Sequence, residues 1–101
     1  MKVRAHVLVS GRVQGVYYRS YTQDAARSLG ITGWVQNTRG GQVEAIFEGE
    51  EEAVQSMVEW CRRGSPSSRV DEVEVEWETP TGEFEDFSVT YRYRFRGDGG
   101  E

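Results

Sequence analysis

The most informative stretch of the chain, residues 11–19, has the sequence GRVQGVYYR. It lies between a segment that alternates as a strand does and a segment with helical periodicity. Gly11 and Gly15 allow a tight turn and a close approach of ligand to backbone. Consecutive backbone N–H groups in such a turn, with those at the start of the following helix, form an anion site. The stretch predicts a phosphate-binding loop, with Arg19 supplying a planar fork of donors for phosphate oxygens. The alternative is an ordinary strand-to-helix turn with an exposed arginine.

The elements expected around this loop follow from the periodicity of apolar residues. In chain order they are a strand over 3–9, a helix over 18–29, strands over 31–37 and 42–48, a helix that begins at Glu50 and is ended by Gly64, a strand over 72–78 and an alternating run over 87–95. This order predicts an α+β fold, a ferredoxin-like α/β sandwich of type βαββαβ with an additional C-terminal strand. The two helices would pack on one face of an antiparallel sheet. We expect a single domain over residues 1–96 and a flexible tail over 97–101.

The composition suits a soluble globular protein, because 37% of the 101 residues are hydrophobic and 29% are charged. The net charge of −5 argues against binding to nucleic acid or to an anionic membrane, where basic surfaces supply the affinity. No apolar run approaches the length of about 18 residues expected of a transmembrane helix. The N-terminal sequence begins a strand directly and shows no signal peptide, so we expect a cytoplasmic protein.

The side chains that most often act as catalytic nucleophiles, bases or metal ligands form no recognisable catalytic arrangement in this sequence. The only histidine, His6, lies in the middle of a strand, and the only cysteine, Cys61, lies on the apolar stripe of the second helix. The phosphatase pattern of a cysteine followed six residues later by arginine fails, because that position is Ser67. No cluster of His, Asp and Glu has metal-ligand spacing, so we expect neither a metal nor a cofactor. Alternating glutamates over residues 72–78 are typical of a solvated face.

The remaining candidate is a phosphate site without a side-chain nucleophile, a metal or a conventional base. Such a site can hold a phosphoryl group, stabilise charge and position water. It would therefore hydrolyse only a phosphate that is already activated.

Two motifs resemble those of the acylphosphatase family, small enzymes that hydrolyse the carboxyl–phosphate bond of acyl phosphates. The first is the run from Gly11 to Arg19, and the second is GWVQN at residues 33–37, similar to the family's Gly-Trp-Val-x-Asn. The similarity covers roughly residues 3 to 91. The resemblance implies the same ferredoxin-like fold, a small-molecule acyl phosphate as substrate, and no cofactor. It also implies that phosphate or other anions bind at the loop, and we expect a monomer.

The resemblance also assigns roles to individual residues. Arg19 matches the family's phosphate-binding arginine, and Asn37 matches the asparagine that orients the attacking water. Thr38 would help to hold the side chain of Asn37. The loop that would cradle the phosphate with its backbone comprises Gln14, Gly15, Val16, Tyr17 and Tyr18. Tyr18 stands where phenylalanine is common in the family and would add a hydroxyl near the cradle.

Two other functions remain open from the sequence. The first is a module on the same fold that binds phosphate or carboxylate without catalysis, since a fold does not fix a function. The second is a protein or RNA interaction domain that uses the alternating aromatic and arginine residues over 91–96. The acidic balance of the chain disfavours RNA.

Overall fold

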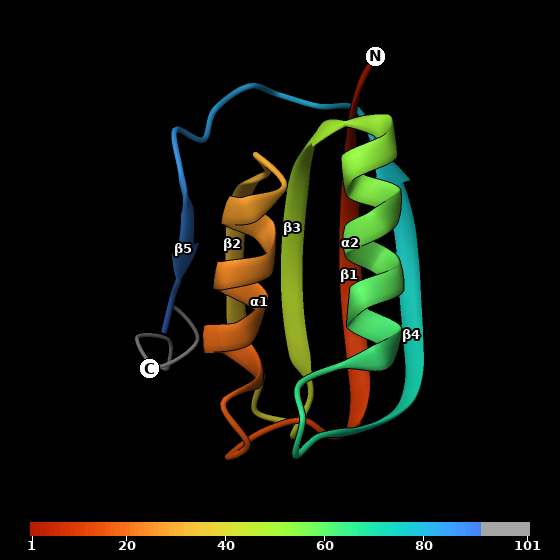
Figure 1. Ribbon diagram of the computed structural model, residues 1–101, viewed down its shortest axis with the longest axis vertical. Helices are drawn as coiled ribbons and strands as arrows, with labels where there is room; N and C mark the ends of the chain where they lie inside the picture. The colour runs from red at the N-terminus through yellow and green to blue at the C-terminus, as the bar shows by residue number, and fades with distance from the viewer. Residues whose placement is uncertain (92–101) are drawn as a thin grey trace.

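The computed structural model describes residues 1–91 of the chain. Its elements, in order, are β1 (Lys2–Arg12), α1 (Tyr18–Ser28), β2 (Thr32–Asn37), β3 (Val43–Glu50), α2 (Glu51–Arg63), β4 (Arg69–Glu78) and β5 (Phe87–Val89). Both helices lie side by side on the same face of one sheet (Figure 1). The element order and the two layers confirm the predicted ferredoxin-like sandwich with an additional C-terminal strand. No helix in this part of the chain has the length and hydropathy needed to span a membrane.

The sheet has five strands in the order β4-β1-β3-β2-β5. The first four strands pair antiparallel, whereas β5 runs parallel to β2. The sheet is mixed because residues 79–86 cross one end of the sheet before β5 begins (Figure 1). β5 has only three residues. The second part of the alternating run, from residue 92, lies outside the described residues, as does the expected tail over 97–101.

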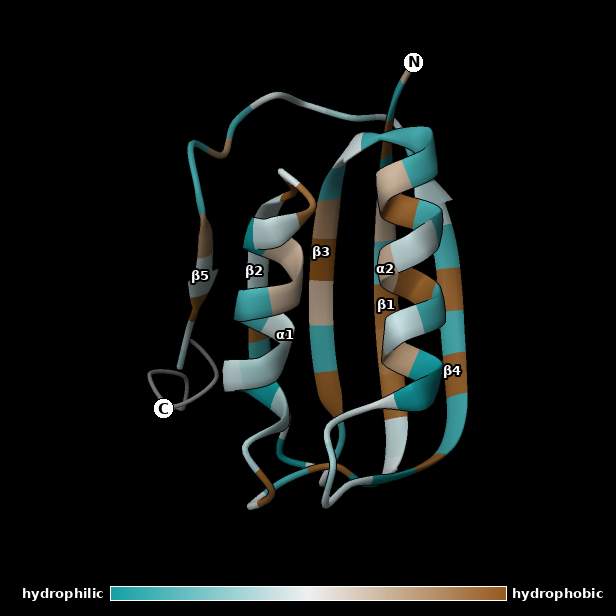
Figure 2. Ribbon diagram, viewed as in Figure 1, coloured by the Kyte–Doolittle hydropathy of each residue, from teal (hydrophilic) through white to brown (hydrophobic). Residues whose placement is uncertain are grey.

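The core lies between the sheet and the helices, where the apolar residues of each strand and helix meet (Figure 2). Ala5, Val7 and Val9 of β1 are buried, as the alternation predicted. The stripe of α2 that includes Met57 and Cys61 is buried against them. Each large apolar side chain buried in this way contributes about 1.5–3 kcal/mol. The Phe47 and Phe87 rings stack with 5.5 Å between centroids, which ties β5 to β3.

The opposite face of the sheet carries the glutamates of β4, which are exposed as expected. Glu48 of β3 is the exception, because only 5% of it is exposed. Its carboxylate accepts hydrogen bonds from Arg4 Nη1 at 2.9 Å and from the backbone N–H groups of Thr81 and Gly82 at 2.9 and 3.0 Å. Glu48 therefore holds the segment that crosses to β5, and β5 in turn supplies one wall of the site described next.

Candidate active site

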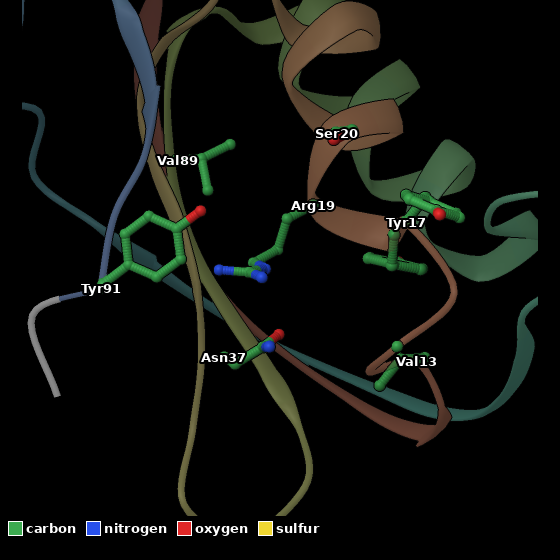
Figure 3. Close-up of a pocket in the computed structure, with 9 residues that line it drawn as sticks. Val13, Tyr17, Arg19, Ser20, Asn37, Val89 and Tyr91 are labelled. Atoms are coloured by element: carbon green, nitrogen blue, oxygen red, sulfur yellow. The ribbon is translucent and has the colours of Figure 1, made fainter. Parts of the chain in front are cut away.

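A hollow of about 310 Å³ opens where β1 ends, α1 begins and β2 ends. Figure 3 shows side chains from these elements and from the end of β5 converging on it. Its lining residues are Val13, Gly15, Tyr17, Tyr18, Arg19, Ser20, Asn37, Val89 and Tyr91. The described surface has other hollows of similar volume, so size does not single this one out. Its unpaired polar atoms do.

The loop between β1 and α1 has the backbone conformation of a tight turn. A bulge between Ser10 and Gly11 interrupts the pairing of β1 with β4. A Cβ at Gly11 would lie 2.2 Å from the carbonyl oxygen of Arg69, so only glycine fits there. Gly15 has a φ of 75°, and Tyr17 adopts the left-handed conformation with a φ of 61°. A left-handed tyrosine costs about 1–3 kcal/mol and is found mainly at functional sites.

The backbone N–H groups of residues 15–19 have no hydrogen-bond acceptor among the described residues. Tyr17, which caps α1, makes no side-chain capping bond either. Unpaired N–H groups at a helix N-terminus, together with the positive end of the helix dipole, attract anions. The loop therefore offers a set of consecutive donors at the wall of the hollow.

Arg19 extends from the first turn of α1 into the hollow (Figure 3). Its guanidinium lies over the ring of Tyr91, with 4.8 Å between Cζ and the ring centroid. Its Nη1 atom is buried and has no hydrogen-bond partner in the described part of the chain. An unpaired buried donor costs about 1–3 kcal/mol, and more when it is charged. Such an atom marks a candidate position for a ligand or an ordered water molecule.

Asn37 is the last residue of β2 and reaches the hollow from the opposite side (Figure 3). Its Oδ1 atom is likewise buried and without a partner among residues 1–91. Arg19 and Asn37 are therefore not hydrogen-bonded to each other, and both atoms remain available to a molecule between them. The structure brings together the two residues that the sequence motifs singled out.

The other predicted site residues contribute in different ways. Gly15, Tyr17 and Tyr18 line the hollow, whereas Val16 is 7% exposed and packs in the core. Gln14 directs its side chain away, to the backbone carbonyls of Thr38 and Gln42 at 2.8 and 2.7 Å. Val16 and Gln14 can therefore serve a ligand through their backbone only.

Thr38 also has a different place from the one expected. Its hydroxyl oxygen accepts the backbone N–H of Gln42 at 3.1 Å, which shapes the turn between β2 and β3. It makes no hydrogen bond to the Asn37 side chain, whose Oδ1 is unpaired. Any influence of Thr38 on Asn37 passes through the backbone.

The Tyr18 hydroxyl does not lie near the cradle, contrary to the sequence expectation. It is buried and donates to the backbone carbonyl of Cys61 on α2 at 2.8 Å. Burial raises the pKa of Tyr18 well above its usual value. The ring points into the core because position 18 lies on the inner side of the first turn of α1, and a buried hydroxyl needs a partner.

Val89 and Tyr91 also line the hollow, although neither belongs to a motif that predicts a phosphate site. They reach the hollow because β5 pairs in parallel with β2, with Val35 opposite Val89. The backbone N–H of Thr90 then donates to the carbonyl of Val35, which brings Tyr91 beside the end of β2. No pattern within the strand itself signals this parallel pairing, since strand alternation does not define a neighbour.

Among the described residues, one group could hold a metal ion, and it lies on the other face of the sheet. The register of β1 and β4 brings His6, Glu76 and Glu78 together, with ligand atoms within 4.8 Å of one another. Sequence spacing could not reveal this cluster, because its members are about 70 residues apart. Both glutamates are exposed, and the His6 Nε2 atom already lies 2.6 Å from Glu44 Oε2.

Burial raises the pKa of the Cys61 thiol to about 12, so this cysteine remains an uncharged core residue.

Comparison with known proteins shows the family to which this chain is similar. The family model described as acylphosphatase matches residues 5–89. An acylphosphatase of Syntrophobacter fumaroxidans is 60% identical over 90 residues, which cover 89% of this chain and 93% of that protein. One from Pelotomaculum thermopropionicum is 51% identical over 90 residues, covering 89% and 98% of the two chains. The crystal structure of acylphosphatase from Bacillus subtilis superposes with a TM-score of 0.85 at 38% identity, covering 88% of this chain and 99% of that one.

Proposed function

The chain belongs to the acylphosphatase family, and we propose that it hydrolyses acyl phosphates to a carboxylate and inorganic phosphate through the hollow at Arg19 and Asn37. The observation that supports this proposal best is the pair of buried, unpaired atoms, Arg19 Nη1 and Asn37 Oδ1, beside a row of unpaired backbone N–H groups. A donor set faces an acceptor across one small space. A phosphoryl group and a water molecule together would satisfy both.

In this proposal the phosphoryl oxygens accept hydrogen bonds from the backbone N–H groups of the loop and from the Arg19 guanidinium. These donors are fixed before the substrate arrives, so they stabilise the charge on the equatorial oxygens in the transition state without reorganising. The stacking of Arg19 on Tyr91 holds the guanidinium in place. No protonated general acid is needed, because the leaving group is a carboxylate.

Asn37 would hold the attacking water through its Oδ1 atom, which can accept a hydrogen bond from one O–H group of the water. The water oxygen forms a bond to phosphorus while the bond between phosphorus and the acyl oxygen breaks. The electron pair of the broken bond leaves with the carboxylate. The amide of Asn37 is not basic enough to take the proton. One proton of the water stays on the attacking oxygen and the other passes to a phosphate oxygen, so that a dianionic acyl phosphate yields a carboxylate and dihydrogen phosphate, each with a single negative charge. Charge and atoms balance without a metal or a cofactor.

We further propose that the chain works as a monomer with residues 1–96 as one domain. The support is that the described elements share one hydrophobic core, and that Arg19, Asn37 and the loop meet at one hollow of this fold.

The function is tested with benzoyl phosphate as substrate and excess chelator in the buffer. Turnover with competitive inhibition by inorganic phosphate is expected. Hydrolysis in ¹⁸O-labelled water should place the label in phosphate, because water attacks phosphorus. No turnover by folded protein would contradict the proposal and leave a phosphate-binding module, and a label in benzoate would contradict the role of the hollow.

A further inference from the structure

Gln14 connects the phosphate loop to the turn that follows Asn37. Its Nε2 atom donates to the carbonyl oxygens of Thr38 at 2.8 Å and of Gln42 at 2.7 Å. Both partners are acceptors only, so the nitrogen of the amide must face them, and both of its hydrogens are used. One side chain therefore bridges two segments that are 24 residues apart.

Each end of this bridge adjoins a residue of the candidate active site. Gln14 precedes Gly15, which lines the hollow, and Thr38 follows Asn37. Neighbouring Cα atoms are about 3.8 Å apart, so a displacement of the turn is transmitted directly to Asn37. The bridge sets the separation between the donors for the phosphoryl group and the residue proposed to hold the water.

The loop side of the bridge is anchored independently of Gln14. Val13 and Val16 are 1% and 7% exposed and pack in the core. The Val16 carbonyl oxygen also accepts a hydrogen bond from the Ser65 hydroxyl at 3.2 Å. Loss of the Gln14 amide should therefore leave the loop in place.

The turn side is more exposed than the loop side. Gly40 and Gly41 are exposed, and the hydrogen bonds between Thr38 and Gln42 lie within the turn itself. These bonds shape the turn but do not attach it to the loop. The Gln42 side chain donates to Ser10 of β1 at 2.8 Å, which holds the far side of the turn. Gln14 holds the side that continues from Asn37.

We propose that Gln14 is a positioning residue: its side chain places Asn37, and the water that Asn37 holds, relative to the bound phosphoryl group. This inference rests on the proposed function. Its signature is a lower kcat with unchanged phosphate affinity, because the loop donors remain in place while the water is displaced. A displacement of about 1 Å at a reacting centre can cost a hundredfold in rate, so we expect a decrease in kcat of at least tenfold.

The test compares Gln14→Met, which keeps the length of the side chain but removes both donors, with Gln23→Met as a matched control. Gln23 lies on α1 and also donates to a backbone carbonyl, that of Phe87 at 3.2 Å, away from the turn. For Gln14→Met we expect kcat with benzoyl phosphate to fall at least tenfold, with the inhibition constant of inorganic phosphate within twofold of wild type. For Gln23→Met both values should stay within twofold.

A double-mutant cycle with Asn37→Ala separates positioning from a general structural effect. If Gln14 acts through Asn37, Gln14→Met should lower kcat little further in the Asn37→Ala background. Gln14→Asn is one methylene too short to span both carbonyls. It should show the same fall in kcat with unchanged phosphate inhibition, and it replaces Gln14→Met in the test if the methionine variant does not fold.

Three results would overturn the inference. In the first, kcat is unchanged in a folded Gln14→Met protein whose wild type is active. In the second, the inhibition constant of phosphate rises as much as kcat falls, which would make Gln14 part of the anion site. In the third, Gln14→Met and Asn37→Ala have fully additive effects. An inactive wild-type protein would instead overturn the proposed function, and this inference with it.

Discussion

The guanidinium of Arg19 lies over the ring of Tyr91, with 4.8 Å between Cζ and the ring centroid. Arg19 lies in the first turn of α1, and Tyr91 follows β5 near the end of the described residues. The parallel pairing of β5 with β2 brings the two residues together. A cation over an aromatic face at a partly exposed site contributes about 0.5–1 kcal/mol. The contact therefore orients Arg19 without satisfying its unpaired Nη1 donor.

Replacement of Tyr91 by leucine should weaken phosphate binding. Loss of the aromatic face removes a cation–π contact worth about 0.5–1 kcal/mol, which orients the Arg19 guanidinium. The inhibition constant of phosphate should therefore rise about two- to fivefold. Tyr91→Phe keeps the face and should bind as the wild type does. Equal binding by all three proteins, measured by inhibition of benzoyl phosphate hydrolysis, would show that the stacking does not matter for Arg19.

Asn37→Ala should reduce turnover far more than affinity. The substitution removes the proposed water ligand but none of the donors for the phosphoryl group, so kcat should fall about a hundredfold with the inhibition constant of phosphate within twofold. Asn37→Asp should instead weaken phosphate binding, because it adds a negative charge beside the anion. Parallel losses of kcat and phosphate affinity in Asn37→Ala would mean that Asn37 binds the phosphoryl group itself.

Tyr18→Phe should lower stability and spare catalysis. It removes the buried hydrogen bond to the Cys61 carbonyl, which lies between the helices and away from the hollow. The free energy of unfolding should fall by about 1 kcal/mol in urea denaturation, with kcat and KM near wild type. A large loss of kcat in the folded variant would place the hydroxyl in the chemistry after all.

Glu48 should make stability depend on pH in the acid range. Burial alone would raise the pKa of Glu48, but hydrogen bonds from the Thr81 backbone, Arg4 and the Gly82 backbone outweigh it and lower the pKa below its usual value of 4.5. A lowered pKa in the folded state gives stability that is present above pH 4.5 and is lost as the pH falls through the folded value.

Urea unfolding of wild type and Glu48→Gln between pH 7 and pH 3 tests this expectation. The variant should be about 1–3 kcal/mol less stable at pH 7, because it weakens a buried charged network. The difference between the two proteins should shrink below pH 4.5. A difference that is constant with pH would show that Glu48 does not titrate with an altered pKa.

The sequence predicted the elements and their layers well, since alternation and helical periodicity directly reflect which side chains face the core. Val7 on its strand and Met57 on its helix are buried as those patterns require. Arg19 and Asn37 could be identified because each belongs to a contiguous motif beside a turn. The features that escaped prediction depend on register and on parallel pairing between distant segments. Tyr91 at the site, the buried Glu48 and the cross-strand group of His6 with two glutamates all arise in this way.

Orientation of single side chains also exceeded what sequence could decide. Tyr18 and Gln14 both belong to the predicted loop, yet their side chains turn away from the hollow to Cys61 and to the β2–β3 turn. A backbone cradle and its structural supports occupy alternate positions in the same motif. Motif membership alone does not separate them.

The most direct test of the account is the hydrolysis of benzoyl phosphate by wild type, Arg19→Ala and Arg27→Ala. Arg27 is a matched control, because it lies on the same helix and pairs with Asp86 on the surface at 2.9 Å. We expect Arg19→Ala to lose about 3–4 kcal/mol of transition-state stabilisation, as for one lost oxyanion donor, and kcat/KM to fall accordingly. The kcat/KM of Arg27→Ala should stay near the wild-type value. Near-wild-type turnover by a folded Arg19→Ala protein would contradict the claim that the hollow at Arg19 binds the reacting phosphoryl group.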